Sequence, residues 1–274
     1  MPLFCMKFNE RIFCLAVRSF SLLSRLNCKQ FSLIVLSACA LQMTACTSLD
    51  MGGSAEIDAD AEVVLQKMSD KLAAAERFTV SGSRNIDPSL LASRKLKQNT
   101  KFEGAIIRPD RIAATSTSGG TTRRFIYEGD DVTLHDVEMN HYATVKGAST
   151  IDRTIDKIIK KWDFHPPMAD LLVSNPYRSL TQGALSGKLN GTQWIGGIKC
   201  QRIAVTKDEV DWEIWIASTD HLPRKLEITF KNQSGQPKVQ LLFQRWNLNP
   251  KLKDSQFTFD PPKDAMEIEM APAD

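Results

Sequence analysis

Alternating hydrophobic and polar residues mark one stretch of the chain above all others, residues 209–250. Apolar side chains occupy every second position in three short runs, at 210–216, 226–230 and 239–243, and this is the spacing of a strand with one buried face. Turn-forming residues separate the runs. The stretch therefore predicts three antiparallel strands whose sheet has one apolar face and one polar face.

The same alternation continues on both sides of a helical region in the middle of the chain. Before it, strands are predicted at residues 78–82, 98–107, 111–117, 122–127, 132–136 and 141–145. After it, strands are predicted at 184–189, 192–195 and 199–207, and candidates follow at 257–262 and 265–270. Turn residues recur between these segments at the spacing of a continuous antiparallel sheet.

Helical spacing of apolar residues occurs in two places. Asp58 or Asp60 is predicted to cap a first helix, because short polar residues are favoured there. Its apolar stripe holds Val64, Leu65, Met68, Leu72 and Ala75. The second place is an insert, with a helix predicted at 149–162, a short helix at 168–174 and a short connection at 177–183.

This order of elements predicts a mainly β protein with one highly curved antiparallel sheet, a half-barrel. The N-terminal helix and the helical insert are expected to cover its concave face. Parallel winding is disfavoured because too few helices alternate with strands. Residues 58–274 are expected to form this one domain.

The N-terminal residues have the pattern of a lipoprotein-type signal peptide at 1–45, followed by a tether at 46–57. A basic region precedes a short apolar run that ends twice in small residues and a cysteine, Leu36-Ser37-Ala38-Cys39 and Met43-Thr44-Ala45-Cys46. Both resemble the bacterial lipobox, and Cys46 is favoured over Cys39 as the lipidated residue. Neither is followed by Asp, which implies anchoring to the outer membrane. An ordinary secretion signal, giving a soluble periplasmic protein, stays open.

Removing the leader changes the charge of the protein. Residues 1–45 hold five of the 35 basic residues and one of the 32 acidic ones, which leaves 30 against 31 and a net charge of −1. The basic character of the whole chain therefore does not indicate a nucleic-acid partner.

Candidate chemistry is sparse, and no catalytic residue, metal site or cofactor is predicted. Cys200 would be the single thiol of the folded domain if Cys46 is acylated, and its apolar neighbours predict a buried, inert position. The four histidines lack metal-ligand spacing. A hydrolase that uses Asp211, Glu213 or His135 is the least favoured hypothesis.

A strongly curved sheet encloses more volume than its own side chains readily fill, so an apolar cavity under the helices is predicted. Its expected lining comes from the first helix and from the apolar face of the C-terminal strands. These residues are Leu65, Met68, Leu72, Trp212, Ile214, Ile228, Leu241 and Phe243. The alternative is that the same residues form a fully packed core.

Several segments together resemble a proteobacterial family of predicted periplasmic proteins of unknown function. They include Arg108-Pro109-Asp110-Arg111, Phe125-Ile-Tyr127-Glu-Gly129, Val210-Asp-Trp212-x-Ile-Trp215, Leu222-Pro-Arg224-Lys-Leu226 and Phe257-x-Phe-x-Pro-Pro262. That family is similar in turn to the lipoprotein carrier LolA and the outer-membrane receptor LolB. The resemblance implies a half-closed barrel with helical lids, and it implies the handling of lipid or lipoprotein.

The sequence thus favours a non-enzymatic binder of an apolar ligand, an acyl chain or a lipoprotein, held at the membrane by its own N-terminal lipid. The competing hypothesis is an envelope scaffold or protein-interaction module with a packed interior.

Overall fold

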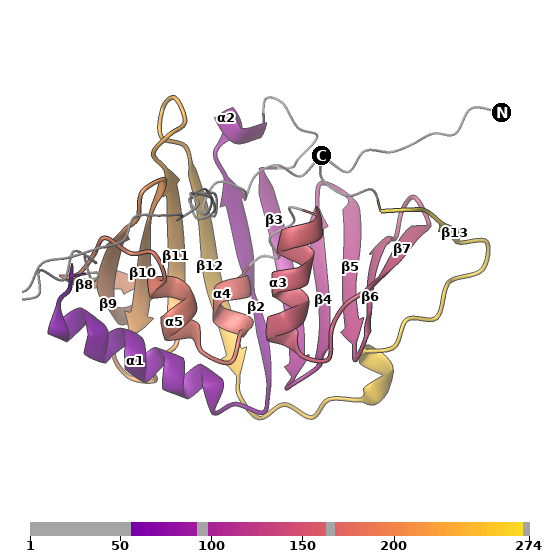
Figure 1. Ribbon diagram of the computed structural model, residues 1–274, viewed down its shortest axis with the longest axis horizontal. Coiled ribbons are helices and arrows are strands. Elements are labelled where there is room, and N and C mark those ends of the chain that lie inside the picture. The colour runs from indigo at the N-terminus through magenta and orange to yellow at the C-terminus, as the bar shows by residue number, and fades with distance from the viewer. Residues whose placement is uncertain (1–55, 92–97, 163–167, 271–274) are drawn as a thin grey trace, which may run out of the picture.

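All strands of the computed structural model, which describes residues 56–91, 98–162 and 168–270, belong to one open, curled sheet (Figure 1). The described part of this sheet has 13 strands. The predicted mainly β fold with a single curved sheet is therefore confirmed. The predicted leader, with Cys39 and Cys46, lies outside the described residues.

The elements follow one another in the order that the hydrophobic pattern predicts, with a helical region between two sets of strands. The first set is β1 (Glu56–Ile57), α1 (Ala59–Ala73), β2 (Arg77–Ile86), α2 (Pro88–Leu91), β3 (Asn99–Ile107), β4 (Arg111–Ser118), β5 (Thr121–Glu128), β6 (Asp131–Asp136) and β7 (His141–Lys146). The helical region is α3 (Ile151–Trp162), α4 (Ala169–Leu172) and α5 (Pro176–Thr181). The second set is β8 (Ser186–Ile195), β9 (Ile198–Thr206), β10 (Val210–Ala217), β11 (Pro223–Phe230), β12 (Lys238–Asn247), the short 3-10 helix η1 (Asp254–Gln256) and β13 (Met266–Glu267).

The sheet joins the two sets of strands through β2 and β12, in the order β1-β8-β9-β10-β11-β12-β2-β3-β4-β5-β6-β7-β13. Every inner pair is antiparallel. The two edge strands differ from the prediction, because β1 pairs with β8 and β13 pairs with β7 in parallel. The helical region carries the chain from β7, near one edge, back to β8 at the other (Figure 1).

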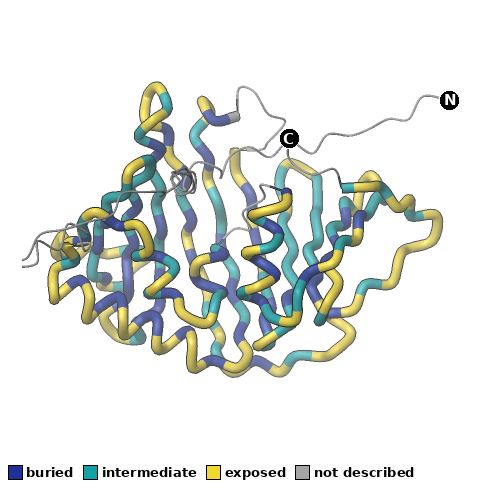
Figure 2. Tube along the Cα trace, in the orientation of Figure 1, coloured by how far each residue is buried: buried dark blue, intermediate teal, exposed yellow. Residues whose placement is uncertain are grey.

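Helices α1, α3, α4 and α5 all lie on one face of the sheet (Figure 1). We call this the inner face and the opposite one the outer face. Alternate strand residues point to the two faces, and the buried positions in Figure 2 concentrate in the strands and on the sheet side of the helices. One large apolar cluster fills the space between the helices and the sheet.

The structure differs from the prediction in four places. Residues 177–183, predicted as a connection, contain most of α5, which Asn175 caps by accepting a hydrogen bond from the Arg178 backbone at 2.9 Å. The two strands predicted between 184 and 195 form the single strand β8, whose pairing with β9 shifts register between Leu189 and Thr192. The segment 257–262 forms no strand, and Glu56–Ile57, placed in the tether, form β1.

Candidate functional site

The inner face carries two apolar rows that run straight across neighbouring strands. The register aligns Val205, Trp212, Ile228, Val239 and Ile86 in one row. It aligns Ile203, Ile214, Leu226 and Leu241 in the next row, which ends at Arg84. This continuous apolar floor follows directly from the alternation of residues in β9 to β12.

The helices cover this floor with apolar stripes of their own. Leu65, Met68 and Leu72 of α1 are fully buried, and they join the same cluster as the floor. Ile151, Ile155 and Ile158 of α3 are also buried. Because these residues recur at helical spacing, each helix presents one apolar side to the sheet and leaves its charged residues in water.

A cavity of about 130 Å³ remains between the floor and the cover, at α3 and α4. Its apolar lining joins Ile155, Ile159, Met168, Ala169 and Val173 of the helical region to Leu226, Ile228, Val239 and Leu241 of the sheet. Arg84, Asp156, Asp170 and Ser179 bring polar groups to it. The site is thus an apolar pocket with a few charged groups, the usual composition of a small-ligand site.

Of the eight residues predicted to line a cavity, seven belong to the buried apolar cluster and Ile228 packs against it, but only Ile228 and Leu241 line this cavity. Leu65, Met68 and Leu72 lie on the buried side of α1. Trp212, Ile214 and Phe243 are also buried, each at most 5% exposed, and do not line the cavity. The structure thus gathers the predicted residues on the inner face and places two of them at this cavity, and their role in binding a ligand stays a prediction.

The sequence did not predict most of the residues that line this cavity. Leu226 and Val239 share a face with Ile228 and Leu241, so the strand alternation could have found them. The residues from α3, α4 and their flanks could not be assigned in this way. Their apolar stripe is visible in the sequence, but the position where the insert crosses the sheet depends on packing between distant segments.

Polar contacts hold α3 mainly at its first turns. The Ile151 backbone donates to the Pro109 carbonyl at 2.7 Å, and Lys157 Nζ donates to the Gly147 carbonyl at 2.7 Å. The Asp152 carboxylate accepts hydrogen bonds from Ser174, just beyond α4, at 2.9 Å from its backbone nitrogen. At the far end, Trp162 Nε1 reaches the Met270 carbonyl at 3.3 Å.

Arg108 fastens the ends of two covering helices to the sheet. Its guanidinium donates to the Leu172 carbonyl at 2.7 Å and to the Leu72 carbonyl at 3.5 Å, and it lies over the Phe78 ring. Burial lowers the pKa of Arg108, and the nearby Asp152 opposes this effect. The side chain thereby hydrogen-bonds to carbonyl groups at the C-terminal ends of α1 and α4, where the helical hydrogen-bond pattern ends.

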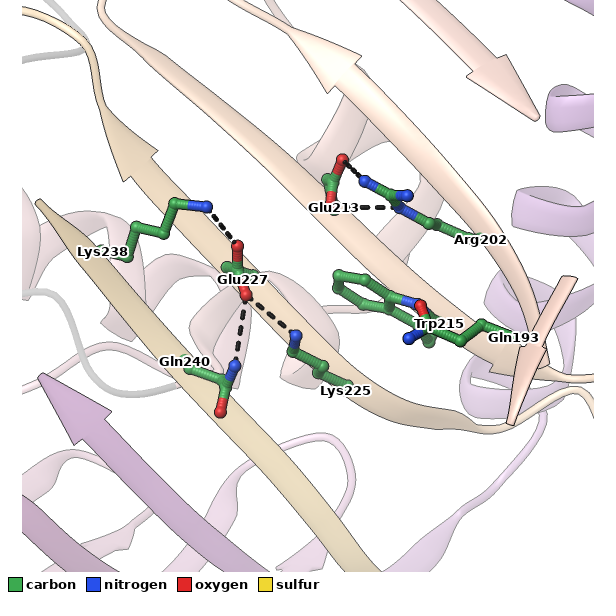
Figure 3. A network of polar contacts seen from close by, with 8 residues as sticks. All are labelled: Gln193, Arg202, Glu213, Trp215, Lys225, Glu227, Lys238 and Gln240. Carbon is green, nitrogen blue, oxygen red and sulfur yellow. Dashed lines mark hydrogen bonds and ion pairs between the residues drawn. The ribbon is translucent and has the colours of Figure 1, made fainter. Parts of the chain in front are cut away.

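The outer face of the same strands is covered by charged pairs (Figure 3). Arg202 donates to both carboxylate oxygens of Glu213, and Glu227 accepts from Lys238 at 2.8 Å and pairs with Lys225 at 2.9 Å. Trp215 lies among them with Lys225 over its ring, and its Nε1 donates to Gln193 Oε1 at 2.8 Å. Burial by itself raises the pKa of Glu227, but hydrogen bonds from Lys238, Lys225 and Gln240 outweigh it and lower the pKa to about 2.

The structure does not bring the candidate catalytic residues together. Glu213 and Asp211 both lie on β10, where Glu213 is paired with Arg202 and Asp211 is paired with Lys231. His135 lies on β6 in the other half of the sheet, where its ring packs against Phe259. Cys200 is fully buried as predicted, and burial raises the pKa of its thiol.

Neither a metal site nor a membrane-spanning helix is found among residues 56–91, 98–162 and 168–270. No group of three or more histidine, cysteine, aspartate or glutamate side chains in these ranges is placed to hold a metal ion. No helix in them has the length and apolar character needed to cross a membrane.

Fold and site together define a mainly β protein with an open curled sheet, a helix-covered apolar face and a small cavity beneath the cover. The family model described as "Predicted periplasmic protein (DUF2092)" matches residues 61–271, and the chain belongs to this family. The resemblance noted in the sequence is thus confirmed, and the family description places its members in the periplasm. No curated protein matches the chain.

Solved structures give loose matches to the fold. An uncharacterized conserved protein from Thermus thermophilus is 10% identical, with a TM-score of 0.46 over 77% of this chain and 99% of that one. The lipoprotein LppX of Mycobacterium tuberculosis is 14% identical, with a TM-score of 0.44 over 72% and 100%. A LolA superfamily protein from Nitrosomonas europaea is 11% identical, with a TM-score of 0.33 over 73% and 97%. Likeness at this level does not indicate what this chain binds.

Proposed function

We propose that this protein is a non-enzymatic periplasmic binder that receives an acyl chain, free or attached to a lipoprotein, on its inner face. The cavity between the helical region and strands β11 and β12 carries this proposal. Its walls are apolar on both sides, and apolar surface removed from water supplies about 25 cal/mol per Å² of binding free energy. The proposal names no catalytic group and no cofactor.

The volume of the cavity determines how such a ligand would enter. A cavity of about 150 Å³ lined by aliphatic and aromatic residues holds a molecule the size of benzene. At about 130 Å³, the cavity accepts only the end of an acyl chain while the cover stays in place. A longer chain therefore requires α3 and α4 to move away from the floor formed by β11 and β12.

The contacts of α3 favour a swinging movement. Its first turns are tied to the Pro109 and Gly147 carbonyls and to Ser174, whereas its last residue makes one longer hydrogen bond within the described part of the chain. The last turn can therefore separate from the sheet at lower cost than the first. Such a movement would lengthen the cavity along the apolar rows toward Trp212 and Ile214.

Titration of the full chain with dansyl-labelled undecanoic acid tests the proposal. Val173→Phe fills the cavity and is expected to weaken binding at least tenfold, whereas Ile228→Ala enlarges it and is expected to preserve binding. Val137→Phe, the same substitution on the exposed β6–β7 turn, serves as the matched control. Equal binding by the Val173 and Val137 variants would place the probe elsewhere and overturn the proposal.

We also propose that an N-terminal lipid on Cys46, or on Cys39, holds the protein at the outer membrane. The support is the lipobox-like sequence ahead of each cysteine and the absence of Asp after either. Metabolic labelling with radioactive palmitate is expected to mark the wild type and Cys39→Ser but not Cys46→Ser. Absence of label from the wild type would rule out the lipoprotein assignment and leave a soluble periplasmic protein.

A second candidate function is a protein-interaction module with a packed interior. The observation that favours it is the burial of six of the eight predicted lining residues outside the cavity, namely Leu65, Met68, Leu72, Trp212, Ile214 and Phe243. In that case the dansyl probe binds none of the variants, and cross-linking in the envelope captures one dominant protein partner.

A further inference from the structure

A second hollow, of about 800 Å³, lies on the outer face of the sheet. Its floor is formed by small side chains of β2, β3 and β4, which are Thr79, Ser81, Ala105, Ala113 and Thr115. Asp220 from the β10–β11 turn, Arg224 near the start of β11 and Gln256 from η1 also line it. The inner-face cavity does not share a single lining residue with it.

The sheet register places the charged residues of this hollow in one straight row. Arg245 of β12 pairs with Ser81, Ser81 with Glu103, Glu103 with Thr115, and Thr115 with Arg124 of β5. Neighbouring strands lie about 4.8 Å apart. The row therefore sets two guanidinium groups at its ends, about 19 Å apart at the backbone, with one carboxylate midway.

The two end arginines are available to a ligand. Within the described residues, neither Arg124 nor Arg245 makes an ion pair or a hydrogen bond, and the side chains are half-buried and exposed respectively. Arg224 differs, since it is paired with Asp220. A guanidinium binds a carboxylate through two parallel hydrogen bonds, so each end of the row is suited to one carboxylate.

The middle of the hollow is suited to hydroxyl groups. Glu103 accepts hydrogen bonds, and the hydroxyls and amides of Ser81, Thr79, Thr115 and Asn247 both donate and accept them. The small floor residues leave room for a flat, ring-shaped body, and the volume lies within the range of about 300–1,000 Å³ usual for small-molecule sites.

We propose that the outer-face hollow is a second binding site, which takes a hydroxyl-rich dicarboxylate of the size of an acidic disaccharide. Arg124 and Arg245 hold its two carboxylates, and Glu103 accepts hydrogen bonds from the hydroxyls between them. This site is separate from the acyl-chain cavity, because the sheet itself stands between the two.

Isothermal titration calorimetry of the full chain with three probes tests this site. Digalacturonate carries two carboxylates and several hydroxyls, sebacate carries the carboxylates alone, and maltose carries the hydroxyls alone. Digalacturonate is expected to bind at least tenfold more tightly than either of the others. The absence of digalacturonate binding, or equally tight binding of sebacate or maltose, would overturn the proposal.

Substitutions locate the binding. Arg124→Gln and Arg245→Gln are each expected to weaken digalacturonate binding about tenfold or more, since each removes one charge-assisted pair. Arg178→Gln, an exposed arginine on α5, is expected to leave it unchanged. Binding of the dansyl fatty acid should be unaffected by all three variants, so failure of this proposal leaves the acyl-chain proposal standing. Unchanged digalacturonate binding in both the Arg124→Gln and the Arg245→Gln variant would show that the sugar binds elsewhere and overturn the proposal.

Discussion

Glu227 shows, at the scale of one residue, how the outer face tolerates a largely buried carboxylate. Its side chain is 13% exposed, yet Lys225, Lys238 and Gln240 each approach one of its oxygens (Figure 3). A carboxylate in such a position remains ionised only when its partners stabilise the charge by more free energy than the loss of hydration costs. The low pKa, about 2, records that balance.

The Glu227 pairs predict a pH-dependent contribution to stability. The folded-state pKa lies below the ordinary value of 4.5, so the contribution is complete above about pH 4.5 and is lost as the pH falls toward 2. Glu227→Gln is expected to lower the free energy of unfolding by about 1–3 kcal/mol at pH 7. Urea denaturation from pH 7 to pH 2.5 should show the difference shrinking below pH 4.5.

Glu269→Gln is the control for this prediction, because Glu269 is exposed and makes no ion pair within the described residues. It is expected to change the free energy of unfolding by less than about 0.5 kcal/mol at either pH. A Glu227→Gln difference that stays constant from pH 7 to pH 2.5 would argue against the charged network.

Gly82 is a second residue on which the sheet depends. A Cβ atom there would lie 2.0 Å from the backbone oxygen of Leu242, where the β12 ladder is irregular between Phe243 and Arg245. Gly82→Ala is expected to destabilise the protein by about 1–3 kcal/mol or more, because backbone must shift. Gly104→Ala, whose Cβ would make ordinary 3.6 Å contacts, is the control. Equal chemical-denaturation midpoints for the two variants would disprove the close approach.

At the scale of elements, regular strands were predictable and their interruptions were not. β3 to β7 have nearly the predicted bounds, because each carries its own alternation between turn residues. β2 runs on to Ile86 through Arg84 and Asn85, two polar residues that hide the pattern. The helix α5 is short, and the packing of Pro176 and Leu180 against the core stabilises it more than its own sequence does.

The helix α3 gives the element-scale prediction. Hydrogen–deuterium exchange is expected to be faster at the amides of Lys160 to Trp162 than at those of Thr154 and Ile155, because the contacts of α3 gather at its first turns. Asp152→Ala, which removes the link to Ser174, should accelerate exchange along α3 and α4. Added palmitate should slow exchange in both helices.

The control for α3 is the exchange of β10, which lies in the middle of one half of the sheet and should be unchanged by the substitution. Uniform exchange along α3, insensitive to palmitate, would refute the swinging movement.

At the scale of the whole molecule, the order of elements was sufficient to predict the fold class. Turn spacing predicts that consecutive strands pair with each other, and those antiparallel pairs need no long-range information. The β2–β12 pair and the parallel edge strands could not be predicted in this way, because they join segments that are far apart in the sequence. Local alternation likewise predicted which face is apolar, as at Ile228 and Leu241. The position of the cavity was not predictable, because it depends on where α3 and α4 pack against distant strands.

The central claim is that the inner face binds an acyl chain. Native mass spectrometry of the full-length protein, released from the envelope of its host and sprayed without fatty acid, tests it most directly. We expect a species heavier by one fatty acid or acyl lipid, which dissociates on collisional activation, whereas a covalent N-terminal lipid stays attached. A protein that carries only its covalent mass, and takes up no palmitate when palmitate is added, would contradict the claim.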